Sequence, residues 1–364
     1  MKVLYAIQGT GNGHISRARE IIPILQDYCQ CDILVSGTQC DVELDFPVKY
    51  RFKGLSFWFG KKGGIDLWNT TINANLPNLR REIALLNVED YDLVINDFEP
   101  VSAWACQKKK VPCISLSHQG SLLSKNVPFP EKKNHFGSFI LRNYAPAMMH
   151  FGFHFQPYDK NIFTPVIRKQ VRECLVEELD YYTVYLPSFD DERLAKFFSH
   201  FKNTNWHIFS KRAKEIYQID NMIIKPITNN AFVEDMAKSK GVLCGAGFET
   251  PAEALFLNKK LLVVPMKGQY EQQCNAAALE CMGVPVIKNL KKKQIEKIGQ
   301  WLESDEKVKV NYPDQTRRII RKLFEVNVQK VLKDNNWDRG YQLTLNPPEF
   351  QRVCFQSSLS DDPE

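Results

Sequence analysis

The 364-residue sequence predicts an α/β protein made of two Rossmann-like, doubly wound domains that face each other across a cleft. Short apolar runs alternate with helix-like stretches in both halves of the chain, which is typical of parallel βαβ units. A polar segment that contains Pro157 and Pro165 interrupts this alternation. We therefore expect one domain at residues 1–163, a second domain at residues 164–335, and a polar tail at residues 336–364.

The first half supplies the elements of the first sheet. An apolar strand at residues 3–7 leads into a glycine-rich loop, and a helix with an aliphatic face follows at residues 16–28. Further strands are expected at residues 33–35, 92–97 and 112–118, with a helix around Trp104 and Ala105. Because parallel strands point the same way, polar residues that follow them gather at one edge of the sheet.

The second half repeats the pattern. Strands are expected at residues 181–186, 206–209, 222–225, 241–244 and 261–265, and helices at residues 191–201, 232–239, 253–257, 271–282 and 314–332. Gly283 closes the fourth of these helices, and the last helix is basic and amphipathic. Ligands of open parallel sheets bind beyond the carboxyl ends of the strands, and each half carries a glycine-rich segment there.

Composition indicates an ordinary globular protein and argues against nucleic-acid binding. Hydrophobic residues make up 44% of the chain and charged residues 25%, and the net charge of +6 comes from short, scattered basic clusters. No apolar stretch approaches the ~18–20 residues of a membrane span, and no signal peptide is evident. The ten cysteines contain no CxxC pair, so we expect reduced thiols and a cytoplasmic location.

We expect no metal site in this chain. His150 and His154 are spaced four residues apart, but no acidic residue lies between them. Phe151, Phe153 and Phe155 alternate around them as in a strand, so the two histidines are better explained as packing residues.

The first glycine-rich segment, GTGNGH, runs from Gly9 to His14 between a strand and a helix. Free backbone N–H groups at such a turn can face an anion. A dinucleotide fingerprint would have a glycine at the position of His14 and an acid at the end of the second strand, where Ser36 and Gly37 stand. The sequence therefore argues against NAD-dependent chemistry.

The second segment, GAGFETPAEA, begins at Gly245 directly after a strand. Its glycines allow a tight turn and the close approach of a phosphate. Thr250 and Glu253 are expected to form a capping box at the start of the next helix, with Pro251 in the first turn. The N-terminus of that helix would face a diphosphate. Two interpretations of Glu253 remain: it caps its helix, or its carboxylate accepts hydrogen bonds from ribose hydroxyls.

A third polar segment, KGQYEQQCNA, follows the strand at residues 261–265. Glu271, Gln272 and Gln273 stand where the next helix begins, and amides with a carboxylate suit sugar hydroxyls, which need both donors and acceptors. Taken alone, the segment is better explained as a polar helix start.

The three segments in order resemble a known family. The glycine turn with Thr-x-x-Glu, the apolar strand, and Glu-Gln-x-x-Asn-Ala resemble the donor-binding signature of GT-B fold glycosyltransferases, in particular the UDP-glycosyltransferases and the peptidoglycan lipid-intermediate N-acetylglucosaminyltransferases. GTGNGH is similar to the loop of the latter group and of plant galactolipid synthases. The resemblance covers residues 2–288 and implies an acceptor-side domain at residues 1–163 and a donor-binding domain at residues 164–335.

The resemblance also implies an activity. It implies inverting transfer of a hexosyl or N-acetylhexosaminyl group from a nucleotide sugar, expected to be a UDP-sugar, to an acceptor hydroxyl. A helix dipole and backbone amides would stabilise the leaving diphosphate, so neither a metal nor a further cofactor is expected.

Roles for particular donor-side residues follow from the resemblance. Glu253 would hold the ribose, and Glu271, Gln272 and Gln273 would contact the donor sugar. The diphosphate would bind the backbone of Gly245, Ala246, Gly247, Phe248 and Thr250, with Gly11, Asn12 and Gly13 opposite. Phe232 and the backbone of Val233 would contact the uracil. Where relatives have a glycine-rich loop after the first strand of the second domain, this chain has Leu-Pro-Ser-Phe, in which Ser188 can still bond a phosphate.

On the acceptor side, His14 is the candidate general base; it would otherwise stabilise charge near the diphosphate or simply bond backbone at its helix start. Asp97 is the alternative base. Glu99 and His118 follow strands and are candidates for acceptor binding, although capping a loop would explain such residues equally well.

The acceptor itself is not identified by the sequence, and a lipid, a glycan or a small molecule all remain open. The apolar run Pro146–Phe155, with Lys132 and Lys133 nearby, suggests either a membrane-facing patch and a peripheral location at the inner face of the membrane, or a core strand. Two rival functions remain: an enzyme similar to UDP-N-acetylglucosamine epimerases, and a nucleotide-sugar-binding protein without turnover.

Overall fold

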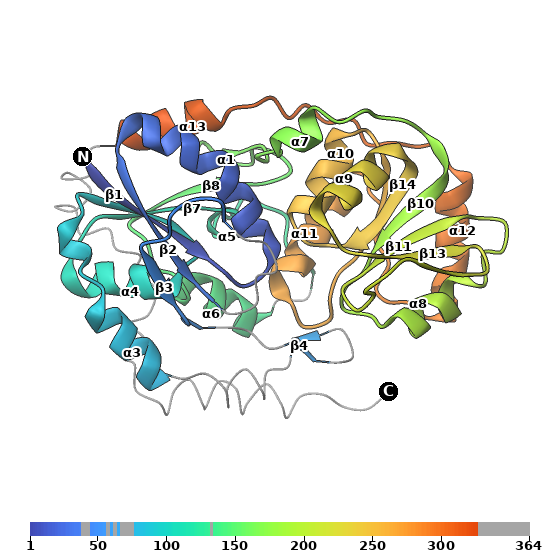
Figure 1. The fold of residues 1–364 in the computed structure, drawn as a ribbon, viewed down its shortest axis with the longest axis horizontal. Helices are drawn as coiled ribbons and strands as arrows, with labels where there is room; N and C mark the ends of the chain where they lie inside the picture. Colours follow the sequence, from blue (N-terminus) through green and yellow to red (C-terminus); the bar gives the residue numbers. More distant parts are fainter. Residues whose placement is uncertain (38–43, 56–58, 61–63, 66–75, 132–133, 327–364) are drawn as a thin grey trace.

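The computed structural model describes residues 1–37, 44–55, 59–60, 64–65, 76–131 and 134–326. It contains two α/β domains that lie side by side, each built on its own sheet (Figure 1). The two predicted Rossmann-like domains are therefore confirmed. Lys132, Lys133 and the predicted tail at residues 336–364 lie outside the described residues. Within the described part of the chain, no helix combines the length and apolar character needed to cross a membrane.

The first sheet has seven parallel strands in the order β3-β2-β1-β6-β7-β8-β9. Its strands are β1 (Lys2–Gln8), β2 (Gln30–Ser36), β3 (Tyr50–Phe52), β6 (Leu93–Asp97), β7 (Cys113–Ser117), β8 (Met149–Phe153) and β9 (Ile162–Phe163). The helices of this domain are α1 (Asn12–Tyr28), α3 (Leu76–Leu85), α4 (Pro100–Lys109), α5 (His118–Ser121) and α6 (His135–Asn143), with a 3-10 turn at Val88–Asp90. A separate antiparallel pair joins β4 (Phe59–Gly60) and β5 (Gly64–Ile65).

Burial on both faces explains why the strands of this sheet read as continuous apolar runs. In β1, Val3, Tyr5 and Ile7 pack with α1, and the alternating residues Leu4 and Ala6 pack with α3 and α4 on the other side. All five are 0% exposed. The sheet therefore holds the ends of β1 and β6, which carry the candidate site, in a fixed position.

The second sheet has six strands in the order β12-β13-β11-β10-β14-β15, and only the edge strand β12 is antiparallel. Its strands are β10 (Leu179–Tyr185), β11 (Trp206–Ser210), β12 (Tyr217–Ile219), β13 (Met222–Pro226), β14 (Ser239–Gly245) and β15 (Lys260–Val264). The helices are α8 (Asp191–Phe198), α9 (Asn229–Lys238), α10 (Glu249–Phe256), α11 (Tyr270–Cys281) and α12 (Ile295–Glu303), with a 3-10 turn at Lys292–Gln294.

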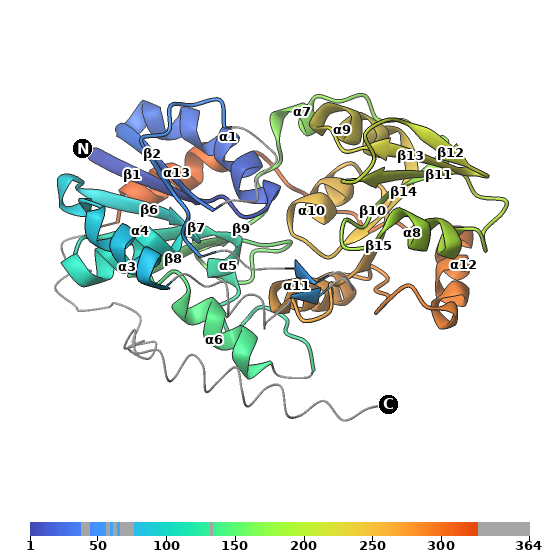
Figure 2. The same cartoon turned by 60° about the horizontal axis from the view of Figure 1, so that its bottom comes forward.

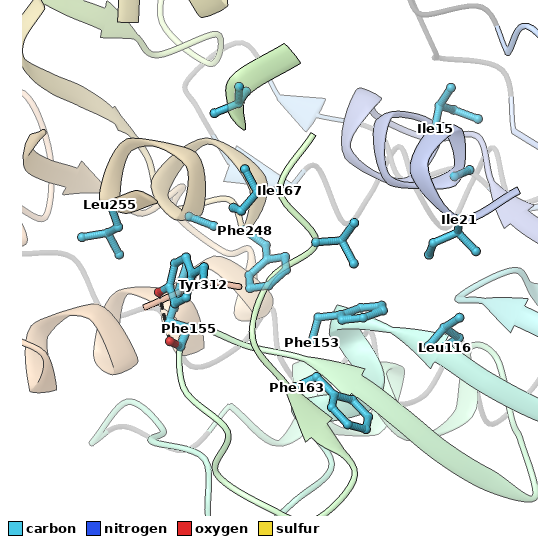
Figure 3. Close-up of a cluster of buried hydrophobic side chains, with 14 of the residues drawn as sticks. Ile15, Ile21, Leu116, Phe153, Phe155, Phe163, Ile167, Phe248, Leu255 and Tyr312 are labelled. Carbon is cyan, nitrogen blue, oxygen red and sulfur yellow. Dashed lines mark hydrogen bonds between the residues drawn. The ribbon is translucent and has the colours of Figure 1, made fainter. Parts of the chain in front are cut away.

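One hydrophobic core is shared by both domains. It runs from Ile15 of α1 through Phe153 and Phe155 to Phe248 and Leu255 in and beside α10 (Figure 3). The hydroxyl of Tyr312 donates to the carbonyl of Phe155 over 2.9 Å, across the same junction (Figure 3). The domains are therefore packed on each other and not merely linked.

The chain crosses between the domains twice. The short helix α7 (Lys169–Arg172) lies at the first crossing, and α13 (Thr316–Phe324) returns to the first domain and lies along α1 (Figures 1 and 2). The rings of Tyr28 and Phe324 stack with centroids 5.6 Å apart, and Arg317 donates to Asp27 over 2.8 Å. The sequence-based boundary placed this helix in the second domain, whereas its apolar face is buried on the first.

The apolar run Pro146–Phe155 forms β8 and the residues beside it. Phe151, Phe153 and Phe155 are each 1% exposed and belong to the shared core. The membrane-facing patch suggested for this run is therefore wrong, and the core-strand alternative is correct. His154 is also fully buried, as expected for a packing residue.

Candidate active site

The GTGNGH segment brings α1 close to the second domain. Gly11 is the N-cap of α1 and has a φ of 92°, a left-handed conformation that favours glycine. A Cβ added to Gly13 would lie 3.0 Å from Cγ of Glu249, so the backbone of Gly13 closely approaches this side chain. The start of α1 therefore lies directly against the start of α10.

His14 and Asp97 form a hydrogen-bonded pair. Nδ1 of His14 lies 2.8 Å from Oδ1 of Asp97, which stands at the carboxyl end of β6 and is 0% exposed. Burial alone would raise the pKa of Asp97, but the neighbouring Arg17 and His14 hold it below its ordinary value. An ionised Asp97 accepts the Nδ1 proton, which leaves Nε2 of His14 as the proton acceptor. Both candidate bases thus belong to one unit.

Arg17 completes this unit and was not among the residues that the sequence singled out. Its Nη2 donates to both carboxylate oxygens of Asp97, over 2.7 and 2.8 Å, and lies 3.1 Å from Nδ1 of His14. Its Nη1 donates to Oε1 of Glu249 on the second domain. The only signal in the sequence was its position one helical turn after His14, which places both side chains on one face of α1.

The glycine turn of the second domain leads into α10 earlier than predicted. The helix begins at Glu249, with Phe248 as N-cap, and no side chain accepts a hydrogen bond from its first turn. The predicted capping box of Thr250 and Glu253 is therefore wrong, because Thr250 lies inside the helix and not at its N-cap. The N–H groups at this end remain free of a side-chain cap, as an anion site requires.

Glu253 is engaged by an arginine of the interdomain connection. Nε and Nη2 of Arg168 donate to its two carboxylate oxygens over 2.5 and 2.6 Å, and Glu253 is only 2% exposed. Arg168 is the N-cap of α7, at the crossing between the domains. Arg168 therefore bonds both carboxylate oxygens of Glu253, and helix capping does not describe this residue.

Glu249 carries a perturbed carboxyl group between these ion pairs. Burial raises its pKa, Arg17 and His14 oppose that rise, and the charges of Glu253 and Asp97 add to it, so that the pKa is about 7. Its side chain is 20% exposed.

The start of α11 contributes a contact across the domains and a contact within its own domain. Oε2 of Glu271 accepts from Nε2 of Gln119 over 3.0 Å, and the same Gln119 nitrogen lies 3.4 Å from Nε2 of His14. Oε1 of Gln272 accepts from the backbone N–H of Met266, which fixes the loop before the helix. Glu271 therefore lies beside the unit of His14, while Gln272 supports its own loop.

His118 and Asn275 join the domains beneath this layer. Nδ1 of His118 donates to the carbonyl of Phe153 over 2.8 Å, and Nε2 lies 2.7 Å from Oδ1 of Asn275. Nδ2 of Asn275 donates to the carbonyl of Ala246, and the His118 ring stacks on Phe248 with centroids 3.9 Å apart. His118 is 1% exposed with both nitrogens engaged, so the geometry gives it a structural role.

The remaining candidates lie in three different environments. Glu99 is the N-cap of α4, where it accepts from the N–H groups of Val101 and Ser102 and is fully buried, so the capping alternative describes it. Phe232 and Val233 are 5% and 3% exposed in the core, and only backbone is left to contact a base. Ser188 follows β10, and Gln273 lies on α11; both are partly exposed.

No group of three or more histidine, cysteine, aspartate or glutamate side chains is arranged to hold a metal ion in the part of the chain that the structure describes. The charged groups at the junction instead form pairs, with Arg17 joining Asp97 and Glu249 and with Arg168 on Glu253. The arrangement offers one histidine as a base and one uncapped helix end as an anion site.

Solved structures with the same architecture are glycosyltransferases. Arabidopsis thaliana UGT89C1 in complex with UDP-L-rhamnose aligns with a TM-score of 0.54 at 12% identity, over 92% of this chain and 98% of that chain. Acinetobacter baumannii MurG aligns with a TM-score of 0.51 at 13% identity, over 91% and 98% of the two chains. Phytolacca americana UGT2 in complex with UDP-2fluoro-glucose and pterostilbene aligns with a TM-score of 0.50 at 12% identity, over 98% of each chain.

The two sheets and the facing domains define a GT-B fold glycosyltransferase. The chain belongs to glycosyl transferase family 1, whose profile matches residues 1–304. Among curated proteins, none matches the sequence. The predicted fold, family and class of enzyme are therefore confirmed, and the activity is the transfer of a sugar from a nucleotide sugar.

Proposed function

We propose that this glycosyltransferase moves a sugar from a UDP-sugar to an acceptor hydroxyl, with inversion at the anomeric carbon and without a metal ion. The observation that carries the proposal is the pair of His14 and Asp97, which lies against the start of α10. UDP is favoured as the nucleotide because structures of the same fold are complexes with UDP-L-rhamnose and UDP-2fluoro-glucose.

The base is His14, and Asp97 is its partner. Nε2 takes the proton of the acceptor hydroxyl, whose oxygen attacks the anomeric carbon as the bond from that carbon to the diphosphate breaks. Asp97 holds the Nδ1 proton and stabilises the imidazolium that forms. A single displacement of this kind inverts the configuration. The second assignment considered for Asp97, as the base itself, is not favoured because Arg17 and His14 occupy both its oxygens.

The uncapped start of α10 stabilises the leaving diphosphate. Its first-turn N–H groups and the positive end of the helix dipole favour an anion there. The space beside Gly247 is open, because a Cβ added to it would have no heavy atom within 4 Å. The backbone of Gly245, Ala246, Phe248 and Thr250 would contribute to the same anion site.

The rest of the donor would extend over the second domain. Glu253 would accept from the ribose while it remains paired with Arg168, since a carboxylate offers about four lone-pair positions. Glu271, Gln272 and Gln273 would contact the sugar, Val233 the base through its backbone, and Ser188 a phosphate. The loop residues Gly11, Asn12 and Gly13 would face the diphosphate from the first domain.

The proposal is tested with purified protein and the donors UDP-glucose, UDP-galactose and UDP-N-acetylglucosamine, with and without EDTA. UDP at ~100 times its dissociation constant should stabilise the protein by ~2.7 kcal/mol. Consumption of one donor, unchanged by EDTA, with an inverted product by NMR is the expected result. A C2-epimerised donor would establish the epimerase alternative, and binding of UDP without any consumption would establish the binding-protein alternative.

The variant His14→Ala should bind UDP like the wild type and lose transfer by ~10²–10⁴-fold. The matched control is His200→Ala, because His200 lies just after α8 and its Nδ1 bonds the carbonyl of Phe197 in that helix. Full transfer by His14→Ala would remove His14 as the base.

A further inference from the structure

We infer that Arg17 is a positioning residue that couples the base to the donor loop. The geometry of the dyad of His14 and Asp97 then depends on the position of α10. This inference rests on the proposed function, because it assigns a role in the same reaction. It concerns a side chain that acts through its contacts with His14, Asp97 and Glu249.

The first step of the argument is how tightly Arg17 is held. One nitrogen of its planar guanidinium bonds both oxygens of Asp97, over 2.7 and 2.8 Å, and the other terminal nitrogen bonds Glu249. Its side chain is 2% exposed and lies over the ring of Phe153, with 5.5 Å from the guanidinium carbon to the ring centroid. A rigid group held on three sides transmits a displacement from one partner to the other.

The second step is that its two partners belong to different domains. Asp97 ends β6 of the first sheet, and Glu249 is the first residue of α10 in the second domain. Gly13, next to the base, is in contact range of Glu249 because it has no Cβ. A shift of α10 therefore moves Glu249 and Arg17 together, and with them the carboxylate that orients His14.

The third step is the charge that Arg17 places beside the base. The groups that face the His14 ring are Asp97, the Arg17 nitrogen 3.1 Å away, Gln119 and, through Gln119, Glu271; Glu249 lies behind Arg17. The guanidinium repels a positive charge on the imidazole. It also neutralises Asp97, whose negative charge would otherwise favour that positive charge. Removal of Arg17 should therefore shift the ring signals of His14 in the NMR spectrum. An arginine that only stabilises the fold would leave the ring signals of His14 in place in the folded variant.

Two variants separate charge from position. Arg17→Gln removes the cation, and Glu249→Ala removes the anchor in the second domain while the bond between Arg17 and Asp97 stays. Glu249→Gln is the conservative variant, because its amide oxygen still accepts from Arg17. Arg19→Ala is the matched control, since Arg19 lies on the same helix and pairs with Asp45, which is 72% exposed.

The first measurement follows the histidine signals of the labelled protein by NMR from pH 5 to pH 9. It needs no substrate, and His14→Ala identifies the signal. We expect Arg17→Gln to shift the ring signals of His14 and Arg19→Ala to leave them unchanged. Unchanged His14 signals in folded Arg17→Gln would overturn the inference. If Arg17→Gln does not fold, Arg17→Lys takes its place, because it keeps the charge but loses the planar fork; the position of the His14 signals is again the readout.

The second measurement is turnover of the donor that the wild type consumes. The acceptor is water or an acceptor identified by screening. Glu249→Ala should lower kcat by ~10-fold with KM for the donor within ~3-fold, and Glu249→Gln should restore most of the loss. A loss confined to KM, or no rescue by glutamine, would contradict the coupling. Failure of the wild type to bind UDP would instead contradict the proposed function, and the NMR comparison of the His14 signals would still decide the role of Arg17.

Discussion

At the scale of single residues, Glu249 shows how position changes the chemistry of an ordinary side chain. It stands at the start of α10 between Arg17 and Glu253, and its pKa is raised from 4.5 to about 7. A raised pKa means that the folded protein binds this proton more tightly than the unfolded chain does. The stabilising contribution of the protonated group is therefore complete below pH 4.5 and is lost as the pH rises through 7.

This linkage gives a prediction for the stability of Glu249→Gln, which carries no ionisable group at this position. Relative to that variant, the wild type should lose about 2–3 kcal/mol of unfolding free energy between pH 4.5 and pH 8. Urea denaturation of both proteins at several pH values measures the difference. Parallel pH profiles for the two proteins would show that the fold does not perturb this carboxyl group.

The residue scale also shows what the sequence could reveal about the site. His14 and Asp97 were singled out separately because each follows a strand, and the shared edge of the parallel sheet brings them together. Arg17 and Glu249 were missed because an arginine on a helix and a glutamate in a loop are common. Only the contact between domains, which joins positions 232 residues apart, gives them a role.

At the scale of elements, α4 is held at its start by a glutamate that caps two N–H groups. Glu99 accepts from Val101 and Ser102 over 2.7 Å each and from the hydroxyl of Ser36 over 2.6 Å. Glu99→Ala leaves these buried donors without an acceptor, so we expect a loss of ~2–4 kcal/mol in unfolding free energy. Glu99→Gln should lose less, and turnover per folded molecule should remain close to that of the wild type. A selective loss of turnover in folded Glu99→Gln would instead support the role of Glu99 in acceptor binding.

The other end of the same helix offers a stabilising substitution. Lys110 is exposed and follows the last residue of α4 with a φ of 56°, a left-handed conformation that disfavours residues with a Cβ. Lys110→Gly should therefore raise the unfolding free energy by ~0.5–1 kcal/mol. Urea denaturation checks this, with Lys110→Ala as the control that keeps the Cβ and should change little. Equal stabilities of the glycine and alanine variants would contradict the explanation.

Element starts were predicted less well than element types. The strands at residues 3–7, 92–97 and 261–265 appear as β1, β6 and β15, because fully buried strands leave an unbroken apolar run. The start of α10 was placed at Thr250 from its capping pattern, but the helix begins at Glu249. The stacking of Phe248 on His118 and the bond from Asn275 to Ala246 determine that turn, and both contacts are distant in sequence.

At the scale of the whole molecule, the apolar face of α13 shows a limit of pattern analysis. The predicted apolar side carries Ile320, Leu323, Phe324, Val328 and Val331. Ile320 and Leu323 are fully buried, whereas Val328 and Val331 lie outside the described residues. The pattern does not identify the surface against which this face packs, and nearness in sequence suggested the second domain. The helix instead packs on α1 of the first domain, so that the chain returns across the junction after completing the second sheet.

This return and the shared core predict that the two domains unfold together. Asn275 is 0% exposed and connects the Ala246 carbonyl of the donor loop with His118 of the first domain. Asn275→Ala leaves both groups without their partner, so we expect a loss of ~2–3 kcal/mol and a weaker coupling between the domains. Calorimetry should show one unfolding transition for the wild type, and UDP should raise its midpoint temperature. Asn275→Ala should show two transitions, and UDP should raise the midpoint temperature of the second domain's transition alone. Asn221→Ala is the control, because Asn221 bonds carbonyls within the second domain alone, among them that of Phe201. If both variants melt in one transition with equal shifts, the buried apolar core rather than the polar contacts of Asn275 holds the domains together.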